Sequence, residues 1–171
     1  MIIIKFIILI TIFGASTSIG ILMSKKYKNR VIELRGFKNA INTLETKIKF
    51  TYQPIPEIFK EIATSLDKNI GAIFEKACEY IGENTTKQAW NKAIEEAKIN
   101  LSLNNEDINI IQNLGNLLGK TDMEGQISEI NVTSNFIDAQ IMKAEEERKK
   151  NEKMYRNLGT IVGLAIVIIL I

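Results

Sequence analysis

The residues best placed to do chemistry are Gly119, Lys120 and Thr121, because this tripeptide ends the phosphate-binding loop of many nucleotide-hydrolysing enzymes. That loop requires a first glycine, four intervening residues and a preceding buried strand. Here only three residues separate Gly115 from Gly119, and the preceding "DINIIQNLGNLL" has the periodicity of a helix. Amides inside a helix bond to its own carbonyls and cannot cradle a phosphate. We therefore reject a phosphate-binding loop.

Other catalytic or metal-binding groups are scarce. The chain has no histidine, which removes the commonest general base and the commonest metal ligand. Its one cysteine, Cys78, lies among apolar residues at helical spacing and is typical of a buried small hydrophobe. The net charge is +2, so no overall basic bias indicates nucleic acid. We expect no catalytic residue, no metal, no cofactor and no small-molecule substrate.

The stretch around the rejected loop predicts a tight turn between two helices. Gly119 can adopt the left-handed conformation that ends a helix, and Thr121 with Glu124 forms a capping box for a helix that starts near Asp122. Gly115, one turn earlier, lets a partner helix come close. We expect an antiparallel helical hairpin with almost no loop.

Both ends of the chain predict membrane segments, residues 1–23 and 158–171. No charge lies between Phe6 and Met23, a helix of about 27 Å and close to the hydrocarbon thickness. The uncharged run from Leu158 is about 21 Å long, which is short for a full span. Small residues favour contact between the two segments, although glycine is also simply common in membrane helices. The candidates for this contact are Gly14, Ser18, Gly20, Gly159 and Gly163.

Basic clusters flank the intervening segment. Lys25 to Arg30 follow the first apolar run, and Arg148 to Arg156 precede the second. By the positive-inside rule, residues 24–157 should be a cytosolic helical domain and both chain ends should lie at the opposite face. A cleaved signal peptide is the alternative for the first segment, since "GASTSIG" offers small residues to a peptidase. The cluster from Lys25 resists translocation and favours an uncleaved anchor.

The intervening segment predicts an all-α protein: a compact bundle of about six helices between an N-terminal and a C-terminal membrane helix. Apolar residues from Leu34 to Ile48 recur at spacings of three and four, and that helix should stop before Pro54. Pro56 suits the first turn of the next helix. Thr85 with Gln88 predicts a capping box, and Asn104 can cap a later helix. No sustained alternation predicts a strand in this segment.

The segment "LGNLLGKTDMEGQ" resembles the LG-x-x-LG-x-[ST]-D-x-x-x-Q hallmark of the stage III sporulation protein AB family. Four further segments follow that family's order, so the resemblance covers nearly the whole chain: "LRGFKNAINTLETKI", "QPIPEIFKEIA", "QAWNKAIEEA" and "EERKKNEKMYRNLGTIVGLAIVIIL". The resemblance implies two anchors around a domain similar to the cytoplasmic domains of type II secretion platform proteins. It implies work in the mother-cell to forespore channel, in the mother-cell membrane, beside other channel components and a secretion-type ATPase, the stage III sporulation protein AA.

The sequence suggests three classes of function. A non-enzymatic platform that docks the ATPase agrees with the resemblance, and Lys149 and Lys150 are candidate contacts for that partner. A membrane enzyme is disfavoured because no catalytic constellation is visible. A membrane-anchored tether or sensor without a secretion partner is the alternative, but several short capped helices favour a compact domain over one long coiled coil.

Overall fold

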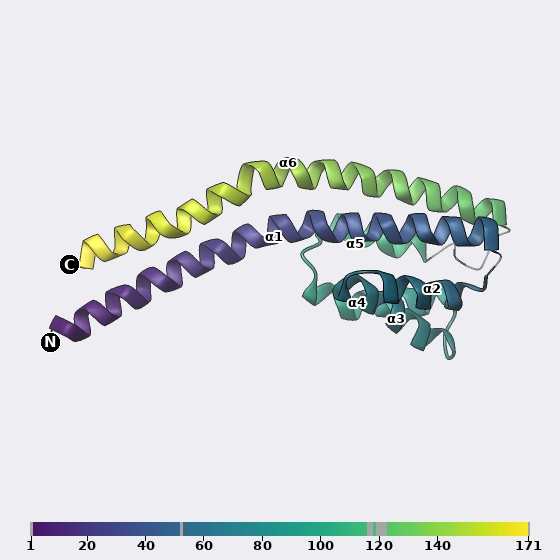
Figure 1. The fold of residues 1–171 in the computed structure, drawn as a ribbon, viewed down its shortest axis with the longest axis horizontal. Helices are drawn as coiled ribbons and strands as arrows, with labels where there is room; N and C mark the ends of the chain where they lie inside the picture. The colour runs from purple at the N-terminus through teal and green to yellow at the C-terminus, as the bar shows by residue number, and fades with distance from the viewer. Residues whose placement is uncertain (1, 52, 116–117, 119–122, 171) are drawn as a thin grey trace. The chain divides into compact units, whose positions relative to one another are not determined.

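The protein was analysed as a computed structural model that describes residues 2–51, 53–115, 118 and 123–170 (Figure 1). The chain divides into two compact units. Unit 1 combines residues 1–31 with 143–171, and unit 2 is residues 32–142. The described residues are almost entirely helical and contain no strand. The all-α prediction is therefore confirmed.

Two helices belong to both units. Helix α1 runs from Ile2 to Thr51, so the first apolar run continues without a break into the first helix of the bundle. It ends shortly before Pro54, and α2 (Ile55–Ser65) carries Pro56 in its first turn, as expected. Helix α6 (Met123–Leu170) likewise joins the last bundle helix to the C-terminal apolar run.

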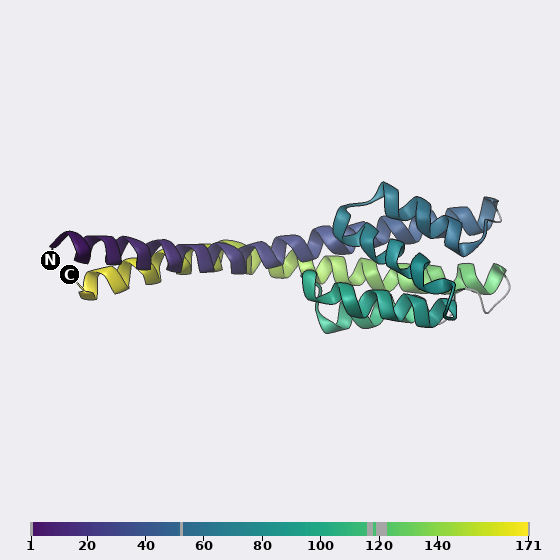
Figure 2. The same cartoon turned by 90° about the horizontal axis from the view of Figure 1, so that it is seen from below.

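The remaining helices lie within unit 2. They are α3 (Lys68–Ile81), α4 (Thr86–Ala97), the short 3₁₀ helix η1 (Lys98–Asn100) and α5 (Asn105–Leu114). Both predicted N-caps are present as full capping boxes: Thr85 with Gln88, and Asn104 with Asp107. Figure 2 shows these short helices gathered beside the unit 2 portions of α1 and α6.

An aromatic cluster forms the centre of unit 2. Phe37 of α1, Phe59 of α2, Phe74 of α3 and Trp90 of α4 are almost completely buried. The rings of Phe59, Phe74 and Trp90 lie 5.1–5.4 Å apart between centroids, within the range of favourable aromatic contacts. Burial of side chains of this size is the main stabilising contribution that the sequence could offer to so small a unit.

Helix α5 ends earlier than expected. The sequence predicted an end at Gly119, whereas α5 ends at Leu114 with Gly115 as its C-cap. The indole N–H of Trp90 donates to the carbonyl of Ile111 (2.8 Å), which is the acceptor that Gly115 would use in a continuing helix. The amide of Gly115 donates instead to Gln112, so the last turn tightens and the helix stops.

Gly115 is required at this position because Trp90 packs directly on it. A Cβ atom at residue 115 would lie 2.3 Å from Cδ1 of the indole. The partner that approaches Gly115 is therefore a tryptophan side chain from α4. The predicted turn residues Gly119, Thr121 and Asp122 lie outside the described residues.

Candidate functional site

Unit 1 is an antiparallel pair formed by the N-terminal part of α1 and the C-terminal part of α6. The backbones touch where Gly20 meets Gly159: a Cβ on Gly159 would lie 2.7 Å from Cα of Gly20. The hydroxyl of Ser16 donates to the carbonyl of Gly159 (2.8 Å), a hydrogen bond between helices. Only glycine allows this approach, so the pairing depends on residue size as well as on apolar character.

The small residues in the contact are partly those expected. Gly20, Gly159 and Gly163 lie in the interface, and a Cβ on Gly163 would be 3.2 Å from Cβ of Ser16. Gly14, in contrast, has open space where its side chain would be, and Ser18 is exposed. Ser16 takes the place expected for Ser18, because a two-residue step turns a helical side chain to a different face.

Polar contacts continue the pairing beyond the apolar segments. The rings of Tyr27 and Tyr155 stack with centroids 5.6 Å apart. The guanidinium of Arg30, almost fully buried, donates to the carboxylate of Glu147 (2.8 Å). Along α6, Arg148 pairs with Glu152. Two of the acidic residues in and next to the basic cluster of α6, Glu147 and Glu152, are therefore engaged by arginines.

Five cations remain on the outer surface at this level, and we call them the basic collar. All five side chains are exposed, and the described part of the chain contains no ion pair that involves them. They come from two clusters distant in sequence that the helix pairing brings to one level. The basic collar consists of Lys25, Lys26 and Lys28 on α1 and Lys153 and Arg156 on α6.

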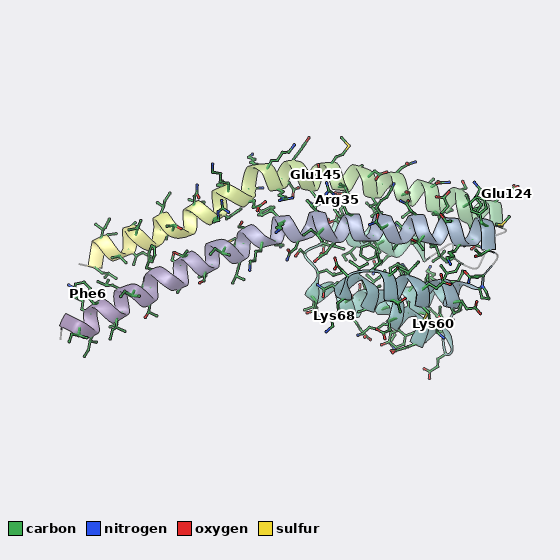
Figure 3. The ribbon with its side chains drawn as sticks, viewed as in Figure 1. Phe6, Arg35, Lys60, Lys68, Glu124 and Glu145 are labelled. Atoms are coloured by element: carbon green, nitrogen blue, oxygen red, sulfur yellow. The ribbon has the colours of Figure 1, made fainter. Side chains whose placement is uncertain are left out.

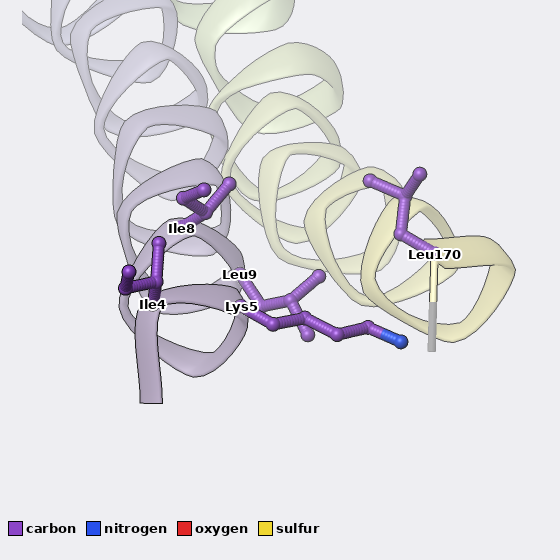
Figure 4. Close-up of a pocket in the computed structure, with 5 residues that line it drawn as sticks. All are labelled: Ile4, Lys5, Ile8, Leu9 and Leu170. Carbon is purple, nitrogen blue, oxygen red and sulfur yellow. The ribbon is translucent and has the colours of Figure 1, made fainter. Parts of the chain in front are cut away.

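At the ends of the pair the helices leave open apolar clefts. One, of about 360 Å³, is lined by Ile4, Lys5, Ile8, Leu9 and Leu170 (Figure 4). A second, of about 250 Å³, has a wholly apolar lining. Apart from the amine of Lys5, which is directed toward α6 in Figure 4, the first lining offers no group for acid–base chemistry. Such surfaces suit contact with lipid chains or other helices.

Both helices of unit 1 are long and apolar enough to cross a membrane, and little of their apolar windows is buried within the protein. The side chain of Phe6 on α1 (Figure 3), for example, is 59% exposed. Most of the apolar surface of these two helix segments is exposed, and such a surface fits a hydrocarbon environment better than water.

Unit 2 contains a separate buried polar site at the start of its α1 segment. The carboxylate of Glu33 accepts hydrogen bonds from the amides of Ser102 (2.7 Å) and Leu103, which lie between η1 and α5. Burial is the largest effect on Glu33 and, with the nearby carboxylate of Asp107, raises its pKa from 4.5 to about 7, although the two amides act in the opposite direction. Glu33 thus holds the segment that leads into α5, and we found no sequence pattern that would have identified it.

The predicted partner residues Lys149 and Lys150 are exposed on α6 within unit 1. Like the basic collar, they take part in no ion pair in the described part of the chain. Glu124, predicted to help cap the last helix, is exposed in the first turn of α6.

Cys78 carries the one thiol of the chain. Cys78 is half-buried, its sulfur lies 3.1 Å from the carbonyl of Pro56, and burial raises the pKa of its thiol, so the reactive thiolate is disfavoured. Among the described residues, no three acidic, cysteine or histidine side chains gather as metal ligands.

Three comparisons with known proteins find the same family. The family model described as stage III sporulation protein AB matches residues 5–171. A curated relative, the stage III sporulation protein AB of Bacillus subtilis (strain 168), is 27% identical over 158 residues, which cover 91% of this chain and 92% of the relative. A solved structure of a stage III sporulation protein AB has a TM-score of 0.68 at 22% identity, covering 71% of this chain and 98% of the solved one. This last likeness concerns the fold.

Proposed function

Because this chain belongs to the stage III sporulation protein AB family, we propose that it is a non-enzymatic membrane platform in the secretion-like channel between mother cell and forespore. In this proposal the apolar helix pair of unit 1 anchors the protein in the mother-cell membrane. The helical unit faces the mother-cell cytosol. The partner is a secretion-type ATPase, the stage III sporulation protein AA, together with other channel components.

The observation that carries the proposal is the arrangement of charge on α6 next to the apolar segment. Glu147 and Glu152 are held by Arg30 and Arg148, while the neighbouring Lys149 and Lys150 are left on the outer face. Exposed cations of this kind attract an acidic partner surface and raise its association rate. The basic collar lies nearer the apolar segments.

A role without catalysis agrees with the residue inventory. The sequence has no histidine, and the thiol of Cys78 is kept protonated by burial. The buried carboxyl of Glu33 is bonded to backbone amides, as a structural group would be. A compact helical unit continuous with two long apolar helices suits a docking base better than a reaction site.

The test is co-purification of the ATPase with the full-length protein from sporulating membranes. The charge-reversal variant Lys149→Glu/Lys150→Glu should retain several-fold less ATPase than the unmodified protein, and most clearly at low salt, since exposed charges are screened at high salt. The unfolding midpoint should hardly change, because both side chains are exposed.

A matched control is Lys60→Glu/Lys68→Glu, which reverses two exposed cations on α2 and α3 (Figure 3). This control should retain the ATPase. Equal loss in both variants would indicate a general charge effect and refute a contact at Lys149 and Lys150. If the unmodified protein retains no ATPase at all, the platform proposal fails, and a membrane-anchored tether or sensor remains.

A further inference from the structure

We propose that the basic collar is a binding site for the headgroups of anionic phospholipids in the membrane that holds unit 1. The proposal concerns a surface of five cations that the pairing of α1 with α6 assembles from both ends of the sequence. It does not rest on the ATPase interaction, and it requires only that the apolar pair lies in a bilayer.

The depth of the cations along the helices supports a lipid over a protein partner. Lys25 and Lys28 follow Met23 by two and five residues, and Arg156 and Lys153 precede Leu158 by the same steps. At 1.5 Å per residue, all lie about 3–8 Å beyond the apolar segments. The headgroup layer of a bilayer is roughly 5–8 Å thick on each side, so these cations reach phosphate level.

Lys149 and Lys150 lie farther from the apolar segment of α6 than the basic collar does. They precede Leu158 by nine and eight residues, which places them about 12–14 Å beyond the apolar segment. The helix geometry therefore separates two surfaces: a basic collar at the lipid headgroups and a pair of cations beyond them, accessible to a protein.

The packing beneath the basic collar supports the same conclusion. Tyr27 and Tyr155 stack at this level, and tyrosine is enriched where membrane helices leave the hydrocarbon. Glu152, the acidic side chain next to Lys153, is paired with Arg148. The exposed charges at this level are therefore cationic, although the whole chain has a net charge of only +2.

The test uses the full-length protein in detergent with an equimolar mixture of phosphatidylglycerol and phosphatidylethanolamine, and native mass spectrometry counts the lipids that stay bound. One cation near an anionic headgroup is worth about a fivefold preference. Since the contributions will not all add, we expect phosphatidylglycerol to be retained about tenfold over phosphatidylethanolamine. Added salt should reduce this ratio.

The decisive variant replaces all five residues of the basic collar with glutamine, and the ratio should fall to about one. A matched control removes five cations of unit 2 and should keep the ratio of the unmodified protein. The control substitutions are Lys49→Gln, Lys60→Gln, Lys68→Gln, Lys87→Gln and Lys92→Gln.

Two further variants keep the test valid if the fivefold variant folds poorly. The double variant Lys25→Gln/Lys153→Gln should lower the ratio partially, and arginine at Lys25 and Lys153 should preserve it, because charge is retained. No preference in the unmodified protein, an unchanged ratio without the basic collar, or equal loss in the control would each overturn the proposal. Loss of ATPase retention with an unchanged lipid ratio would instead assign the basic collar to the protein partner and refute lipid binding.

Discussion

Replacing Glu33 with glutamine should make unit 2 more stable at neutral and alkaline pH. Glutamine keeps an oxygen that can accept the amide of Ser102, and it removes the charge that burial penalises. Its new amide can also donate toward the neighbouring carboxylate of Asp107. The exchange therefore keeps an acceptor for the amide of Ser102 and removes the ionisation of residue 33.

The magnitude follows from the pKa of Glu33, which burial raises from 4.5 to about 7. One pKa unit corresponds to about 1.4 kcal/mol, so the whole shift would be worth at most about 3.4 kcal/mol. Solvent still screens part of this carboxyl, and we expect about 1–2 kcal/mol. The unfolded state loses the proton near pH 4.5 and the folded state near pH 7, so the contribution of Glu33 to stability is lost as pH rises through this window.

Urea unfolding of the full-length protein in detergent measures the effect, with fluorescence of Trp90 as the probe. Trp90 is the only tryptophan and lies in the core of unit 2, so its signal reports this unit alone. Between pH 5 and pH 8, the unmodified protein should lose about 1–2 kcal/mol of unfolding free energy relative to Glu33→Gln. Carboxyl groups distant from residue 33 contribute equally to the stability of both proteins, and their effects cancel in this difference.

Glu83→Gln serves as the control, because Glu83 is exposed just after α3. Its pH dependence should follow that of the unmodified protein. If Glu33→Gln showed the same pH dependence as the unmodified protein, Glu33 would titrate normally and the argument from burial would be wrong. A large loss of stability at both pH values would show that the exchange breaks the hydrogen bonds themselves.

Three other substitutions test the packing. The first uses a chain in which Cys78 is replaced by serine and cysteines are placed at Ser16 and Gly163. These two cysteines should form a disulfide within one molecule on mild oxidation, because a Cβ at residue 163 would lie 3.2 Å from that of residue 16. Cysteines at Gly14 and Gly163 should form none, and gel mobility with and without reductant measures both outcomes. Gly71→Ala should cost about 1–3 kcal/mol, since its Cβ would lie 2.5 Å from a carbonyl oxygen of α2; an unchanged urea midpoint by circular dichroism would disprove this contact. Trp90→Phe should cost a similar amount, about 1–3 kcal/mol, by leaving a buried carbonyl of α5 without its donor, and the same measurement tests it.

Much of the fold follows from local chemistry that a sequence displays. Pro54 marks the end of α1, and Pro56 marks the start of α2, because proline restricts the residues around it wherever it occurs. The capping boxes at Thr85 and Asn104 are likewise formed by residues only three apart. The apolar seam from Leu34 to Ile48 is buried throughout, because its spacing already defines one face of a helix.

Features that depend on contacts between distant residues were not predictable in the same way. The end of α5 is set by Trp90, which takes the carbonyl of Ile111 and packs on Gly115 from another helix. The role of Glu33 likewise depends on amides some seventy residues away in the chain, and nothing in its local sequence distinguishes it from a surface glutamate.

The candidate site shows the same division. The sequence by itself determined that both chain ends are apolar, that each is flanked by cations, and that small residues could bring the two helices together. Only the tertiary structure decided that Gly20 and Gly159 make the contact while Gly14 does not, because helix register selects the face that meets a partner. That register also brings Glu147 of α6 to the buried guanidinium of Arg30 and leaves the lysines exposed, since a buried charge requires a partner and an exposed one does not.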